Sequence, residues 1–221
     1  METVELLAFL SYQTADKTAA SQVKAVLSGV GISVFLAHED ISVSEEWRLK
    51  ILDEIGRASI FVGLLSKNYF QSPWCVQESG IAAYRSDMTV IPLSLDGAIP
   101  QGFISNFQSV KVDPERITIH DLIPGFLKHD FTVGIGLIIE LICRSRSYRS
   151  AEANFQLLLP HVPKMTDEQI RVLLERVAEN DQVHYASLCA REYLPPLLNT
   201  HGHLLKPTTC SLLKKVCADS S

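Results

Sequence analysis

An uninterrupted apolar run at residues 58–65, with the sequence ASIFVGLL, constrains the fold of this chain more than any other feature. A β-prone run that leads into a helix is typical of a buried strand in a parallel sheet followed by a crossover helix. The helix is expected at about residues 74–85, because Ser72 can cap its N-terminus and Pro73 suits its first turn. This segment therefore predicts one strand and one covering helix of an α/β sheet.

The expected helix carries a lone acidic residue on an apolar face. Trp74 and Glu78 are four residues apart and share a face that continues through Ile81 and Ala82. A carboxylate on a core-facing stripe costs free energy unless something uses it. Glu78 is therefore a candidate functional residue, and the alternative is a carboxylate that caps a neighbouring loop.

Strand and helix patterns alternate along the first two thirds of the chain. Strands are expected at residues 4–10, 32–36, 59–65, 88–93 and about 107–112, and helices at about 18–28, 45–57, 74–85 and 133–143. Such alternation predicts a parallel sheet with right-handed crossovers, and five strands favour the flavodoxin-like order 2-1-3-4-5. The last crossover should be short or irregular, because few residues separate strands four and five.

This strand order also predicts where a ligand would bind. In a flavodoxin-like sheet the crevice lies outside the carboxyl ends of strands one and three. Those ends are residues 11–16 and 66–73, and the second leads directly to Trp74 and Glu78. Topology and the lone carboxylate thus indicate the same place.

The character of the chain changes after Arg144. Residues 144–150 are polar and basic, and Thr166 with Gln169 forms a capping-box signature. The helix that follows carries its apolar residues at helical spacing: Ile170, Leu173, Leu174 and Val177. A second helix is expected at about residues 182–193, before two prolines, and a short last one at 206–216. We therefore predict a domain at residues 1–145 and a helical region at 146–221.

Composition excludes several classes of partner. The formal net charge is −5 and no long basic run occurs, so nucleic-acid binding has little electrostatic support. The longest apolar stretch is too short to span a bilayer, and the first residues do not resemble a signal peptide. The five cysteines are odd in number and scattered, which suits reduced thiols and predicts a cytoplasmic protein.

Other chemical motifs are missing or weak. The chain has no dinucleotide-binding glycine fingerprint, P-loop, nucleophile elbow or zinc-protease motif. A group of His201, His203, Cys210 and Cys217 lacks the tight pairing of a zinc site, so no metal is expected. Cys75 stands near a helix N-terminus, but a buried structural thiol is the preferred interpretation.

Three segments carry a resemblance to a known family: Ala8-Phe9-Leu10-Ser11-Tyr12 followed by Asp16, residues 34–41 leading to Glu46-Trp47, and Ser72-Pro73-Trp74-Cys75-Val76-Gln77-Glu78. In this order and spacing they resemble a Toll/interleukin-1 receptor (TIR) domain. The chain looks most like bacterial TIR domains, including those of Thoeris-type antiphage defence. The resemblance covers about residues 3–143 and leaves out the helical tail.

The resemblance implies an NAD-cleaving enzyme and its site residues. Glu78 would be the catalytic glutamate, and NAD would be the substrate, with no separate cofactor. The first loop would line the pocket, the loop at residues 37–44 would gate it, and a tryptophan would stack on a ring of the substrate. These predicted site residues are Ser11, Tyr12, Gln13, Asp40, Ser44, Trp47 and Trp74. Both tryptophans have core packing as the alternative.

One departure from the family pattern concerns the phosphates of NAD. Many eukaryotic members carry basic residues after the first segment, whereas Gln13-Thr14 is neutral here. Backbone amides, Lys17, Lys67 or another subunit would have to supply these contacts. We therefore expect a homo-oligomer on activation, and the resemblance also implies a separate effector protein that senses the product.

The chemistry needs only one carboxylate. Nicotinamide is bound in NAD as a cation and departs as a neutral ring, so no proton donor is required, unlike in an ordinary glycosidase. A carboxylate can orient the ribose and stabilise the oxocarbenium-like transition state. The product is ADP-ribose or a cyclic ADP-ribose isomer, and the sequence does not choose between them. The alternative function is a non-catalytic TIR scaffold that assembles signalling complexes.

Overall fold

The apolar run forms the central strand of a five-stranded parallel sheet. The computed structural model describes residues 6–37 and 47–220, and in it β3 (Ile60–Leu65) is buried at every residue. The other strands are β1 (Leu7–Ser11), β2 (Ser33–Leu36), β4 (Thr89–Ser94) and β5 (Val110–Lys111), in the order β2-β1-β3-β4-β5. The predicted fold class and strand order are confirmed.

The strand register gathers several carboxyl ends at one edge of the sheet. Ser11, the last residue of β1, is in register with Gly63 of β3, and Leu65 is in register with Ser94 at the end of β4. The loops that follow β1 and β3 therefore start side by side, which is the arrangement expected of the crevice in this fold.

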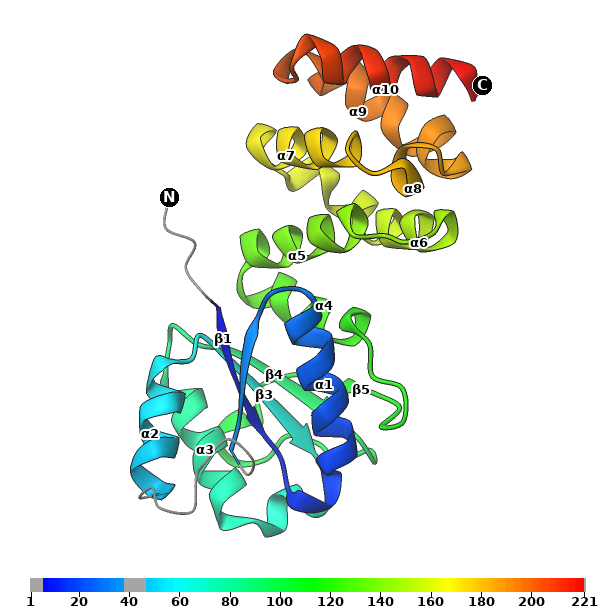
Figure 1. The fold of residues 1–221 in the computed structure, drawn as a ribbon. Helices are drawn as coiled ribbons and strands as arrows, with labels where there is room; N and C mark the ends of the chain where they lie inside the picture. Colours follow the sequence, from blue (N-terminus) through cyan, green and yellow to red (C-terminus); the bar gives the residue numbers. More distant parts are fainter. Residues whose placement is uncertain (1–5, 38–46, 221) are drawn as a thin grey trace. The chain divides into compact units, whose positions relative to one another are not determined.

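Four helices among the described residues cover this sheet. Their bounds are α1 (Lys17–Gly29), α2 (Trp47–Arg57), α3 (Pro73–Tyr84) and α4 (Ile119–His129), with short 3₁₀ turns η1 (Thr14–Asp16), η2 (Tyr69–Gln71) and η3 (Gly102–Ile104). Figure 1 shows α2 and α3 on one face of the sheet and α1 and α4 on the other. Only η3 lies between β4 and β5, as expected for a short, irregular crossover.

Helix α4 was not predicted from the sequence. Its N-terminal signal is present, since Thr118 and Asp121 form a capping box. Pro124 lies inside this helix. Because proline in a helix interior usually marks a break, the sequence pattern there does not indicate a helix.

Close packing of α4 on the sheet gives a stability prediction. A Cβ added to Gly125 would lie 2.8 Å from the Ile91 side chain of β4. We expect Gly125→Ala to destabilise the fold by about 1 to 3 kcal/mol, as overpacked core sites do. Gly56→Ala in α2 is the matched control, because a Cβ there meets nothing within 4 Å, and it should raise stability by up to about 1 kcal/mol. Chemical denaturation measures both, and an equal effect of the two changes would contradict the packing argument.

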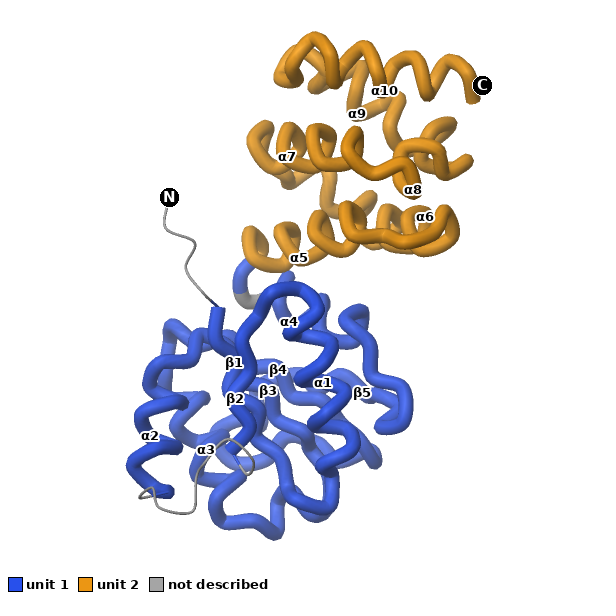
Figure 2. Tube along the Cα trace, viewed as in Figure 1, with its two compact units in different colours: residues 1–130 blue, residues 131–221 orange. Residues whose placement is uncertain are grey.

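The described chain divides into two compact units, residues 1–130 and 131–221 (Figure 2). The second unit contains α5 (Phe131–Cys143), α6 (Tyr148–Leu158), α7 (Asp167–Val177), α8 (Asp181–His184), α9 (Leu194–His201) and α10 (Pro207–Asp219), with short turns η4 (Leu159–Lys164), η5 (Cys189–Tyr193) and η6 (Gly202–Leu204). The pairs α5–α6, α7–α8 and α9–α10 stack in that order.

The helical tail was predicted in outline, with one error. Thr166 caps α7 in a capping box with Gln169, and all four predicted apolar residues of that helix are buried. Residues 144–147 connect α5 to α6, which begins at Tyr148. The single helix expected at 182–193 is wrong, since α8 ends at His184 and Pro195 and Pro196 lie inside α9. The π turn η5 comes directly before these prolines, where their missing N–H groups interrupt the regular helix ladder.

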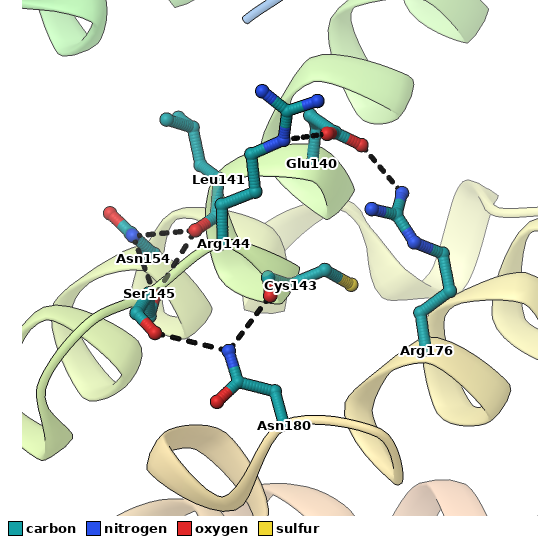
Figure 3. A network of polar contacts seen from close by, with 8 residues as sticks. All are labelled: Glu140, Leu141, Cys143, Arg144, Ser145, Asn154, Arg176 and Asn180. Carbon is teal, nitrogen blue, oxygen red and sulfur yellow. Dashed lines mark hydrogen bonds and ion pairs between the residues drawn. The ribbon is translucent and has the colours of Figure 1, made fainter. Parts of the chain in front are cut away.

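A polar network ties α5 to the helices that follow it (Figure 3). The amide of Asn154 donates to the carbonyl of Leu141 and to Ser145 Oγ, both at 3.1 Å. The amide of Asn180 donates to the carbonyl of Cys143 at 2.8 Å, so both amides satisfy carbonyls at the end of α5. Glu140 accepts from Arg176 of α7 at 2.5 Å and pairs with Arg144. α5 thus groups with the helical tail in the structure, whereas residues 133–143 were expected in the first domain.

Candidate active site

Helix α3 begins where the sequence predicts and presents Glu78 to the interior. Ser72 is its N-cap, with the Ser72 side chain accepting from the amide of Cys75 at 3.4 Å, and Pro73 occupies the first turn. The buried face consists of Cys75, Glu78, Ser79 and Ala82. The predicted stripe shared by Trp74 and Glu78 is therefore wrong, because Trp74 is 38% exposed and lies at the edge of this face.

The carboxylate of Glu78 is buried, and only one of its two oxygens accepts a hydrogen bond from a described residue. The residue is 1% exposed. Its Oε2 accepts a hydrogen bond of 2.5 Å from Ser11 Oγ, at the carboxyl end of β1. Its Oε1 is buried and has no hydrogen-bond partner among the described residues. Burial raises the pKa of Glu78 from 4.5 to about 7, against the opposing effect of the Ser11 bond.

Tyr69 completes the surroundings of this carboxylate and was not predicted. Its ring is fully buried, and its hydroxyl lies 3.0 Å from Ser11 Oγ and donates to the carbonyl of Cys75 at 3.1 Å. The sequence offered one usable signal, since Tyr69 is an aromatic residue inside the polar segment 66–73 that follows β3. Burial raises the pKa of Tyr69 well above its ordinary value, so the phenol keeps its proton.

The loop that carries Tyr69 is fixed by hydrogen bonds at the same edge of the sheet. Ser66 Oγ donates to Asp16 at 2.6 Å and accepts from the amide of Tyr69 at 3.1 Å. The carboxylate of Asp96 accepts from the amide of Lys67 at 3.0 Å. The ends of β1, β3 and β4 are thereby joined, and the position of Tyr69 relative to β1 is set.

The structure treats the predicted residues of the first loop differently from one another. Ser11 contacts Glu78 directly. Tyr12 is 1% exposed and belongs to the core. Gln13 is partly exposed and caps η1, because its side-chain oxygen accepts from the amide of Ala15 at 2.5 Å. That these residues line a substrate pocket stays a prediction.

Trp47 and Trp74 form a stacked pair between α2 and α3. Their ring centroids are 5.8 Å apart and their planes differ by 13°. They are 42% and 38% exposed, so the alternative of core packing is wrong for both. Asp40 and Ser44 of the expected gating loop lie outside the described residues.

Two other kinds of site were considered from the sequence, a nucleophilic Cys75 and a metal site. Cys75 is a free, fully buried thiol, and burial raises its pKa to about 11. A thiol in that state is a weak nucleophile, which confirms the structural interpretation. In the described ranges no group of three His, Cys, Asp or Glu side chains is arranged to hold a metal ion. Nor does any helix there have the length and apolar character needed to cross a membrane.

A family model for the TIR domain matches residues 8–122, which is more than half of the chain. The chain belongs to the TIR-domain family. A similar solved structure is the TIR domain of the Toll-related receptor TRR-2 from Hydra magnipapillata. The similarity covers 57% of this chain and 96% of that one, with 17% sequence identity and a TM-score of 0.45. A comparison with curated proteins gives no match.

Proposed function

We propose that this TIR domain cleaves the nicotinamide–ribose bond of NAD, with Glu78 as the catalytic carboxylate. The observation that carries the proposal is a buried carboxylate at the carboxyl ends of β1 and β3, with one oxygen bonded to Ser11 and the other without a partner in the described part of the chain. The residues that resemble bacterial TIR enzymes of antiphage defence support the same activity. In such a role the product, or the loss of NAD, would be a cytoplasmic signal that a separate effector protein detects.

The unpaired oxygen is the strongest sign of a ligand. A buried acceptor without a donor costs about 1 to 3 kcal/mol, and more when it is charged. Ser11 holds Oε2, so Oε1 of Glu78 is the atom left to accept from an incoming group. A ribose hydroxyl of NAD would donate to this oxygen and remove the cost.

The bond cleavage needs no other charged group. The electron pair of the C1′–N bond leaves with nicotinamide, which changes from a cation to a neutral ring. The ribose becomes oxocarbenium-like at C1′, and the carboxylate of Glu78 opposes that developing charge. Water then adds at C1′ and releases a proton, giving ADP-ribose. Attack by a group of the same molecule gives a cyclic ADP-ribose isomer instead.

Burial of Glu78 means that the active form differs from the structure described here. A carboxylate that is 1% exposed cannot contact a dinucleotide until its surroundings move. The first loop also offers the neutral Gln13-Thr14 rather than a cation for the diphosphate. We propose that assembly of subunits opens the site and supplies the missing contacts.

Incubation of the full chain with NAD, followed by chromatographic separation of the products, tests this function. We expect nicotinamide release with a specific activity that rises with protein concentration. Constant specific activity in a protein that stays monomeric would contradict the assembly step alone. Absence of nicotinamide release at every concentration, with and without an extract of infected cells, would contradict the enzyme.

A scaffold function has one observation in its favour. Large apolar side chains are exposed on α2 and α3, including Trp47, Leu49, Leu52, Trp74 and Val76, and exposed apolar groups often mark interaction sites. Both tryptophans of the chain are in the stacked pair, so intrinsic fluorescence reports on this place. A change in fluorescence on dilution but none on addition of NAD would favour the scaffold.

A further inference from the structure

Two hydroxyl groups connect Glu78 to the backbone of its own helix. Ser11 Oγ lies 2.5 Å from Glu78 Oε2 and 3.0 Å from the hydroxyl of Tyr69. The same Tyr69 hydroxyl lies 3.1 Å from the carbonyl oxygen of Cys75, in the first turn of α3. Ser11 and Tyr69 are both fully buried, so water does not compete for these bonds.

The number of available protons decides which group donates in each of these hydrogen bonds. An ionised carboxylate only accepts, so the one proton of Ser11 goes to Glu78. Ser11 Oγ then accepts the one proton of Tyr69, which in this state turns away from the carbonyl of Cys75, and both bonds point toward the negative charge. Because hydrogen bonds in a row polarise one another, the donation by Tyr69 makes Ser11 a stronger donor.

Protonation of Glu78 reverses the direction of these bonds and restores the bond from Tyr69 to the carbonyl of Cys75. The carboxyl group then donates to Ser11, Ser11 donates to Tyr69, and Tyr69 donates to the carbonyl of Cys75. Every hydroxyl proton has an acceptor in both states, and in each Oε1 is the carboxyl oxygen with no hydrogen-bond partner among the described residues. The titratable side chains that interact with Glu78 among the described residues are Tyr69 and Cys75, and both remain protonated near neutral pH.

We propose that Tyr69 is a positioning residue which, through Ser11, holds Oε2 of Glu78 and so leaves Oε1 to receive the ribose hydroxyl. This inference rests on the proposed function for the identity of the ligand, but the coupling of Tyr69 to Glu78 does not. Tyr69 itself touches neither the substrate nor the reacting atoms. Its effect passes through Ser11 alone, which makes the proposal testable by a double-mutant cycle.

The test measures the titration of Glu78 by ¹³C NMR of its carboxyl carbon, assigned with Glu78→Gln. Tyr69→Phe keeps the ring and removes the hydroxyl, and it should raise the pKa of Glu78 by roughly 0.5 to 1 unit. Ser11→Ala should raise it further. The double variant should titrate like Ser11→Ala, because the effect of Tyr69 needs Ser11. Tyr193→Phe is the matched control, since it removes a hydroxyl that accepts from Gln156 in the second unit, and it should leave the titration unchanged.

A shift in the double variant beyond that of Ser11→Ala would overturn the proposal, as would no shift in Tyr69→Phe. Incorporation of 3-fluorotyrosine at position 69 keeps the fold and makes the phenol a stronger donor, so it should lower the pKa of Glu78. That variant decides the matter if Tyr69→Phe does not fold.

In NAD cleavage at pH 8.5, Tyr69→Phe should lower kcat several-fold with little change in KM. If no variant or wild-type protein cleaves NAD while the NMR cycle behaves as expected, the proposed function fails and the coupling stands.

Discussion

Glu78→Gln is expected to remove NAD cleavage, with a fall in kcat/KM of at least about 100-fold. Glutamine keeps the shape of the side chain and can still contact Ser11, but it has no charge to oppose the oxocarbenium-like ribose. The loss should appear mainly in kcat, since the charge acts in the transition state more than in the bound state. Nicotinamide release at saturating NAD measures it.

The control for this change is another nearly buried glutamate in the same unit. Glu54 is 7% exposed and pairs with Lys50 and Arg57 on α2, away from the contacts of Glu78. Glu54→Gln should keep its activity within a few-fold of wild type. Activity of Glu78→Gln within tenfold of wild type would remove Glu78 from the chemistry.

The second large effect concerns stability, and it has the opposite sign. Burial raises the pKa of Glu78 from 4.5 to about 7, so the folded state holds this proton more tightly than the unfolded state. Between these two values the unfolded state loses the proton first, and the free energy of unfolding falls as pH rises. Glu78→Gln does not titrate, so at pH 8 it should be more stable than wild type by about 2 to 3 kcal/mol.

The pH dependence separates this effect from ordinary packing changes. The difference in the free energy of unfolding between Glu78→Gln and wild type should be largest above pH 7. It should vanish toward pH 4, where Glu78 is protonated in both the folded and the unfolded state. Tryptophan fluorescence during denaturation follows the first unit alone, because both tryptophans lie on α2 and α3. A gap that does not vary with pH would show that Glu78 titrates normally in the folded state.

Features of the fold that depend on local pattern could be predicted from the sequence. The run at residues 58–65 became β3, Ser72 and Pro73 began α3, and Thr166 began α7. In each case the signal lies within a few residues of the element that it specifies. Helix α4 shows the limit, because one internal proline outweighed a capping box.

The site was predicted only in part, because its contacts join residues far apart in the chain. Glu78 could be found from its own helix, since a lone acid on an apolar face is a local signal. The face was misjudged, however: positions 75, 78, 79 and 82 fit a helical stripe as well as 74, 78, 81 and 82, and only the sheet beneath decides. Tyr69 could not be found from spacing, because its role depends on Ser11, 58 residues earlier.

The caps at the end of α5 set where the chain can be cut. A shortened protein that ends at residue 145 keeps α5 but loses Asn154 and Asn180, so the carbonyls of Leu141 and Cys143 lose their donors. A cut at residue 130 removes the whole helix together with its partners. The second compact unit starts at Phe131, so we expect a TIR domain that ends at residue 130 to be better behaved in isolation than one that ends at residue 145.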